Sequence, residues 1–136
     1  MRRERSLPEP MIVSLHVASG AAVGALVRSR RLALLIGPFL HVAGDRVPHQ
    51  DIASRRFEIT SGAAGVLLLA LRRGPFDAAT LGAIAASAPD LEHVLPWLRP
   101  RGQELFHGRH GWHRSGRFSA AAQLVLAGAI LGALSR

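Results

Sequence analysis

The stretch "RLALLIGPFLHVAGDRVPHQD", residues 31–51, decides the fold. Its first half is an apolar run, and its second half brings together two imidazoles and two carboxylates: His41, Asp45, His49 and Asp51. A buried polar group without a partner costs stability. We therefore expect these side chains either to satisfy one another or to hold a ligand at the end of an apolar helix.

Four other apolar runs accompany the one in this stretch. Together the five runs cover residues 11–27, 32–44, 59–71, 78–88 and 118–134. The first, third and fifth show no polar stripe of the kind that a water-facing helix needs. The runs predict an all-α protein with one domain, residues 1–136, built as a multi-pass membrane bundle of four or five helices. Because a full span takes about 20 apolar residues, a soluble bundle with buried helices is the alternative.

The composition narrows the class of protein and the chemistry of any site. Of the 136 residues, 49% are hydrophobic and 19% are charged, and all 17 basic residues are arginines that fall in short clusters between the apolar runs. This placement is typical of membrane topology signals. Aromatic residues make up 5% and no nucleic-acid-binding motif is present, which argues against a nucleic-acid partner. Because the chain has no cysteine, metal ligands must be His, Asp or Glu.

The arginines also predict an orientation in the cell membrane. If all five runs span, eleven arginines lie on the side of the N-terminus and six on the other. The positive-inside rule then makes the N-terminus cytoplasmic. We expect the first run to be a retained helix rather than a signal peptide, since it ends in "RSRR", residues 28–31, without a small-residue cleavage site. The same alternation places the ends of the second and fourth helices on one side, together with the polar segment before the fifth. Membrane lipid is the expected partner.

Pairs of His and acidic residues recur at helical spacing. His41 and Asp45 are four residues apart and Asp90 and His93 are three apart, so each pair can share a helix face. His16 lies within the first run, where an ionisable residue is costly unless it is paired or functional. The candidate metal ligands are His16, His41, Asp45, His49, Asp90, His93, His110 and His113. Imidazole and carboxylate ligands suit zinc first, with manganese or iron as alternatives.

Each of these groups also has a purely structural interpretation. His16 can be a hydrogen-bonded packing histidine, and His41 with Asp45 can be a plain structural pair. Asp90 and His93 can terminate a helix. A basic loop that touches lipid phosphates would account for the last group: His107, His110, His113, Arg109 and Arg114. We favour one shared site because all four features fall at the same predicted membrane face.

The order of these motifs resembles a known family. The elements are "SLHVASGAAVGAL", "HVAGDRVPH", "APDLEH" and "HGRHGWHR". They are similar to those of the uncharacterised membrane-bound metal-dependent hydrolases, which are small bacterial multi-pass proteins. The resemblance covers roughly residues 11–117 and implies the ligand set given above, with His110 or His113 as the downstream ligand. The chain departs from the common form in its short length and in Glu92, where Asp is frequent.

The motifs lead to two hypotheses about function. In the first, the protein is a membrane metal-dependent hydrolase in which metal-activated water attacks an unknown substrate, such as a lipid phosphoester. Its candidate catalytic residues are Asp90, Glu92, Arg109 and Arg114, with the two arginines holding an anionic group. In the second hypothesis, a non-catalytic membrane protein binds metal or haem through the same histidines.

Overall fold

The computed structural model describes residues 12–103, 105–106, 114 and 116–136 of the chain. In these residues the protein is all-α, which confirms the predicted class. The long helices are α1 (Val13–Val27), α2 (Arg30–Asp45), α3 (Arg55–Arg73), α4 (Ala78–Ser87) and α6 (Ala120–Leu134). The polar segment before α6 carries short elements, namely the 3-10 turns Ala88–Asp90, Pro96–Leu98 and Pro100–Gly102 and the single-turn helix α5 (Leu91–Val94).

Side-chain caps fix where four of the long helices begin. Each cap accepts a hydrogen bond from an amide two or three residues further on, and the four caps are Ser29, Ser54, Asp77 and Ser119. Such a bond satisfies one of the amides that the first helical turn leaves without a partner. The caps of α2 and α3 lie outside the apolar runs, so both helices include arginines that hydropathy alone left out.

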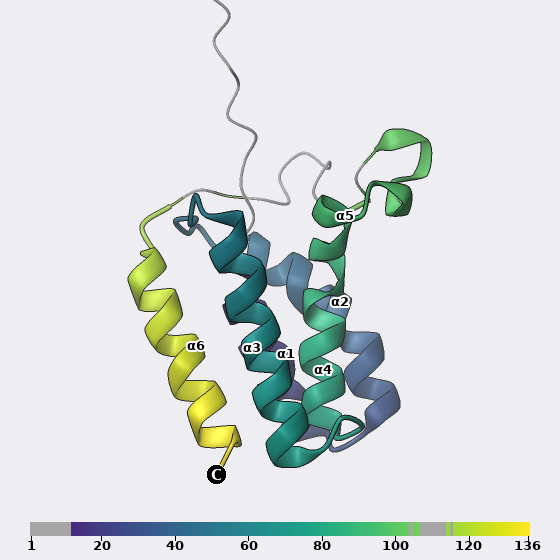
Figure 1. Ribbon diagram of the computed structural model, residues 1–136, viewed down its shortest axis with the longest axis vertical. Coiled ribbons are helices and arrows are strands. Elements are labelled where there is room, and N and C mark those ends of the chain that lie inside the picture. The colour runs from purple at the N-terminus through teal and green to yellow at the C-terminus, as the bar shows by residue number, and fades with distance from the viewer. Residues whose placement is uncertain (1–11, 104, 107–113, 115) are drawn as a thin grey trace, which may run out of the picture.

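The long helices run alternately in opposite directions along the bundle (Figure 1). The C-terminal ends of α2 and α4 lie at the upper end of this view, together with α5 and the N-terminal ends of α3 and α6. The connections from α1 to α2 and from α3 to α4 lie at the lower end, near the C-terminus. The alternation therefore brings the polar segments after α2 and α4 to one end of the molecule, as the sequence predicts.

Helix α1 is the centre of the bundle and contacts α2, α3, α4 and α6. Its crossing with α4 is close because glycines face the neighbouring backbone. A Cβ atom at Gly20 would overlap the carbonyl oxygen of Gly82, and one at Gly24 would overlap that of Ala78. Small residues at helix interfaces permit this approach.

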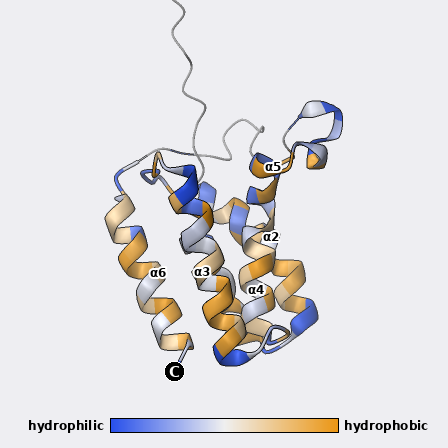
Figure 2. Ribbon diagram, viewed as in Figure 1, coloured by the Kyte–Doolittle hydropathy of each residue, from blue (hydrophilic) through white to orange (hydrophobic). Residues whose placement is uncertain are grey.

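Small side chains fill the interior while large apolar ones face outward. Nine of the fourteen buried hydrophobic residues are alanines, whereas Leu26, Phe39 and Leu71 are 80%, 76% and 75% exposed. Figure 2 shows largely apolar residues along α3, α4 and α6, with hydrophilic residues at both ends of α3 and at the lower end of α2. Among the helices described, none combines the length and hydropathy required of a membrane span.

Candidate metal centre

Three chain segments meet at the upper end of the bundle and bring their polar side chains together. His16 comes from the first half of α1, His41 and Asp45 from the last turn of α2, and Asp90 from the 3-10 turn that follows α4. Both imidazoles are fully buried, and the two carboxylates are 3% and 8% exposed. The alternation of helix direction accounts for the meeting, because it places these three positions at the same level of the bundle.

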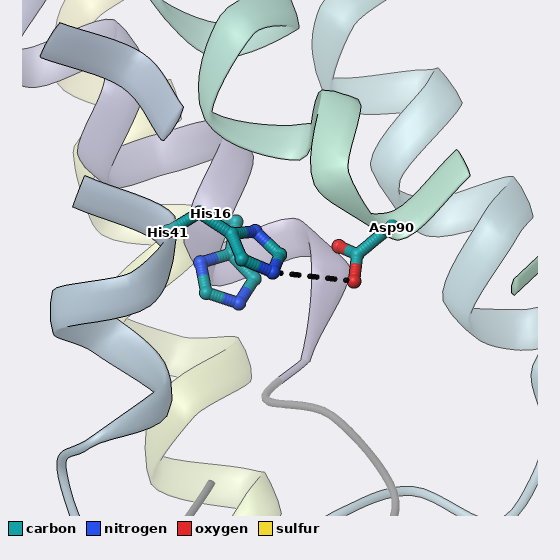
Figure 3. A group of neighbouring side chains, drawn as sticks. All are labelled: His16, His41 and Asp90. Atoms are coloured by element: carbon teal, nitrogen blue, oxygen red, sulfur yellow. Dashed lines mark ion pairs between the residues drawn. The ribbon is translucent and has the colours of Figure 1, made fainter. Parts of the chain in front are cut away.

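The two imidazole rings stack on each other beside the Asp90 carboxylate (Figure 3). The ring centroids of His16 and His41 are 3.8 Å apart, with an angle of 22° between the planes. His41 Nε2 lies 3.6 Å from Asp90 Oδ1, so the structure brings these two predicted ligands together. One potential ligand atom from each of the three side chains lies within 4.8 Å of the others, so the three residues could hold one metal ion.

Asp45 links the two rings through its carboxylate. Its Oδ1 atom lies 3.1 Å from His16 Nε2, and its Oδ2 atom lies 3.3 Å from His41 Nε2. His41 and Asp45 are one helical turn apart, so the pair faces inward from the same side of α2. Asp45 therefore fixes the orientation of both imidazoles, in addition to any contact with an ion.

The tautomer of His41 shows that the group suits a cation. Its Nδ1 atom lies 2.8 Å from the carbonyl oxygen of Ala86, which can only accept, so Nδ1 carries the hydrogen. In the neutral ring the Nε2 lone pair then points towards oxygens of Asp45 and Asp90, which are acceptors themselves. A proton or a metal ion between these atoms removes the repulsion. A ring held by a backbone carbonyl through its other nitrogen is also the usual arrangement of a metal-bound histidine.

His16 has one ring nitrogen to spare. The Nδ1 atom is buried and has no hydrogen-bond partner within the described part of the chain. A packing histidine that is satisfied by the protein would use both nitrogens. The structural interpretation of His16 therefore accounts for the Asp45 contact and leaves Nδ1 unexplained.

Two other predicted ligands lie outside the group. His49 is buried in the segment between α2 and α3, with Nε2 3.1 Å from Asp51 Oδ1 and Nδ1 bonded to the carbonyl of Val47. Burial disfavours the charged form of this ring, but the Asp51 carboxylate and the Val47 carbonyl outweigh it and raise the pKa of His49. His93 is half-buried in α5. The metal roles of both residues remain predictions.

The predicted catalytic residues have different surroundings. The buried Glu92 carboxylate accepts hydrogen bonds from the amides of Leu105 at 2.7 Å and Phe106 at 3.0 Å, and so anchors the polar segment. The Arg114 side chain is exposed, while its amide donates to the carbonyl of Asp45 at 3.1 Å. Their catalytic roles remain predictions. Three further predicted site residues, Arg109, His110 and His113, lie outside the described residues.

Two buried polar residues that support this end of the bundle were not recognised in the sequence. Glu58 of α3 accepts a hydrogen bond from the amide of Val13 at 2.8 Å and so holds the start of α1. Gln123 of α6 donates to the carbonyls of Gln50 at 2.7 Å and Phe118 at 3.0 Å, and thereby holds the segment that carries His49. Gln123 is an isolated polar residue in the apolar run of α6, and this isolation could have indicated a buried structural role.

No protein-family model, curated protein or solved structure matches this chain. The resemblance to the membrane-bound hydrolases consequently depends on the sequence motifs, and the chemistry of the site depends on the geometry of His16, His41, Asp45 and Asp90.

Proposed function

We propose that the protein is an integral membrane protein that holds a divalent metal ion, with zinc as the first candidate, and hydrolyses an ester or phosphoester substrate. The observation that carries the proposal is the convergence of His16, His41 and Asp90 on one point in the interior. Two imidazoles and one carboxylate are a common ligand set of catalytic zinc, and manganese and iron accept the same atoms. In such sites the metal acts as a Lewis acid and activates water for attack on the substrate.

The residues around the group prepare it for this chemistry. The carbonyl of Ala86 holds the hydrogen of His41 on Nδ1 and keeps Nε2 available as a ligand. Asp45 orients both rings, because its two carboxylate oxygens lie 3.1 Å from His16 Nε2 and 3.3 Å from His41 Nε2. Because the rings stack at 3.8 Å, a positive charge on both at once is unfavourable. At least one of the two imidazoles is therefore neutral, which is the form that binds metal.

The arrangement of apolar side chains supports a membrane location. A bundle with alanine and glycine inside and leucine and phenylalanine outside suits lipid, in which close backbone packing replaces a large apolar core. Helices α1, α2, α3 and α6 have 15 to 19 residues, which corresponds to about 22–28 Å at the usual rise per residue. The hydrocarbon core is about 30 Å thick. Local thinning of the bilayer accommodates a modest shortfall of this kind.

A non-catalytic metal-binding protein is the second candidate. The observation that favours it is the engagement of Glu92, whose carboxylate accepts hydrogen bonds from the backbone amides of Leu105 and Phe106. A carboxylate held in this way is less available as a general base. In this alternative, the metal stabilises the end of the bundle where α1, α2 and α4 meet.

Metal analysis separates these possibilities from a purely structural cluster. The protein is purified from membranes in mild detergent and its metal content is measured by mass spectrometry, alongside His41→Ala and Glu58→Gln variants. Glu58 is the matched control, because it is buried at the same end and the amide still offers an oxygen to the start of α1. We expect wild type and the Glu58 variant to carry the metal and the His41 variant to lose it.

The outcomes have distinct meanings. Equal metal content in all three proteins would refute the site. Metal-dependent release of products from a panel of phospholipids and soluble esters would support the hydrolase, whereas bound metal without turnover of any of them would favour the second candidate. Recovery of the protein in the soluble fraction without detergent would refute the membrane location.

A further inference from the structure

The lower end of the bundle carries a cavity that the metal centre does not use. Its volume is about 400 Å³, many times the roughly 30 Å³ share of one water molecule in the liquid. It opens between the ends of α1 and α3 and the start of α2 and α4. Its lining consists of three arginines, one carboxylate and three small residues: Arg28, Arg30, Arg73, Asp77, Gly24, Ala25 and Ala78. The small residues leave the space open, and the arginines give it its charge.

One of the three arginines is fixed by protein groups. Arg73 Nε donates to Asp77 Oδ1 at 2.9 Å, and its Nη1 donates to the carbonyl of Leu134 at 3.4 Å. Asp77 also accepts a hydrogen bond from the amide of Ala79 at 2.9 Å, so it has a structural role at the start of α4. Its partial burial alone would raise its pKa, but the hydrogen bond from Arg73, the Ala79 amide and the charges of Arg73 and Arg30 lower the pKa of Asp77.

The lining therefore has an excess of positive charge. Three arginines and one carboxylate line the cavity, and that carboxylate accepts a hydrogen bond from Arg73. Arg28 and Arg30 flank the tight turn between α1 and α2, where Arg28 adopts a left-handed backbone with a φ of 52°. Guanidinium groups bind phosphate oxygens through paired hydrogen bonds better than other side chains do. The cavity is thus suited to an anion with several oxygens.

Exposed apolar side chains lie at the same end of the bundle. Leu26 precedes the turn in α1, Leu71 lies in the last turn of α3, and Phe76 precedes α4; they are 80%, 75% and 68% exposed. Apolar side chains do not help to bind a free phosphate ion, but they can pack against the acyl chains of a phospholipid. The combination of basic cavity and apolar surroundings is the arrangement by which basic pockets between helices hold lipid headgroups.

We infer that this cavity binds the phosphate group of an anionic phospholipid. Arg28 and Arg30 donate to the phosphate oxygens, and the acyl chains lie against Leu26 and Leu71. Arg73 keeps its structural contacts and adds positive charge. The site lies at the opposite end of the bundle from His16, His41 and Asp90, so it needs no metal and does not depend on hydrolysis.

Binding of a short-chain lipid tests the inference. The purified full-length protein is titrated with dihexanoyl phosphatidylglycerol below its micelle concentration, with dihexanoyl phosphatidylcholine and with inorganic phosphate, and binding is measured by calorimetry. The variant Arg28→Gln/Arg30→Gln removes two charges from the cavity. The matched control Arg31→Gln/Arg72→Gln removes two charges from the same end, at exposed positions that do not line the cavity. Thermal unfolding and helicity are measured for all proteins.

We expect phosphatidylglycerol to bind to wild type and to the control with affinities that agree within about twofold. The cavity variant should bind at least about tenfold more weakly, because each guanidinium-phosphate hydrogen bond is a charged one. Equal weakening in both double variants would overturn the inference, since it would reflect general surface charge. Absence of phosphatidylglycerol binding to folded wild type would also overturn it. Phosphate binding as tight as lipid binding would overturn the lipid as the source of the phosphate group.

Discussion

Replacing His16 with alanine distinguishes a metal ligand from a packing histidine. The ring is fully buried, lies 3.1 Å from Asp45 Oδ1 and stacks on His41. Loss of a group that only orients a ligand already lowers metal affinity by about 10- to 100-fold. Loss of one of three protein ligands should therefore lower zinc affinity by at least about tenfold, which corresponds to about 1.4 kcal/mol or more.

The assay is a competition titration of zinc between the purified protein and a coloured chelator, with thermal unfolding of the metal-free proteins measured in parallel. Ser14→Ala is the matched control on the same helix, because Ser14 is buried and its Oγ has no hydrogen-bond partner among the described residues. Its removal should leave zinc affinity within about twofold and stability nearly unchanged. Unchanged zinc affinity and stoichiometry in His16→Ala, with a lower melting temperature, would refute the ligand assignment.

Three further outcomes test other parts of the structure. Asp77→Asn removes a carboxylate whose pKa is lowered in the folded protein. Its contribution to the free energy of unfolding, about 0.5–1 kcal/mol, should be complete above the unfolded pKa of about 3.9 and disappear as the pH falls through the lower folded pKa. A stability difference from wild type that stays constant in thermal melts across this pH range would contradict the pairing. Gly20→Ala should lower the free energy of unfolding by about 1–3 kcal/mol or more, because the new Cβ overlaps the Gly82 carbonyl. In the control Gly128→Ala the new Cβ meets no atom within 4 Å, so the change should be neutral or stabilising. Equal denaturant midpoints for the two variants would argue against the close crossing of α1 and α4. Glu58→Ala should lower the free energy of unfolding by about 1–3 kcal/mol, because it leaves the first amide of α1 unpaired. Glu58→Gln should retain most of the stability. Equal stability of the two variants in chemical denaturation would exclude this capping role.

The helices were predictable because apolar runs and their separators are local features of the sequence. The run at 78–88 corresponds to α4 almost residue for residue. The run at 59–71 falls short of α3, which extends from Arg55 to Arg73, because Ser54 caps the helix before its arginines begin. A hydropathy pattern detects the apolar part of a helix. It misses the polar turn at a helix end when a capping residue starts the helix before the apolar run.

The candidate site was predictable only in part. The spacing of His41 and Asp45 and the shared side of two helix ends were sufficient to bring His41 near Asp90. The surroundings of Glu92 were not predictable, because the groups that engage it are backbone amides, which every residue carries. The contact that fixes the His41 tautomer was not predictable for the same reason, because the carbonyl of Ala86 is also a backbone group. Motif spacing identifies side chains that share a chemistry, but backbone partners emerge only from the fold.

The close crossing of α1 and α4 connects the packing of the bundle to the geometry of the candidate site. Gly20 lies one helical turn after His16, and Gly82 lies two turns before Asp90. Because these glycines let the two backbones meet, they also set the separation between the imidazole and the carboxylate that would share an ion. A side chain at Gly20 should therefore lower metal affinity as well as stability. The same change at Gly128, far along α6 from this crossing, should leave metal affinity unchanged.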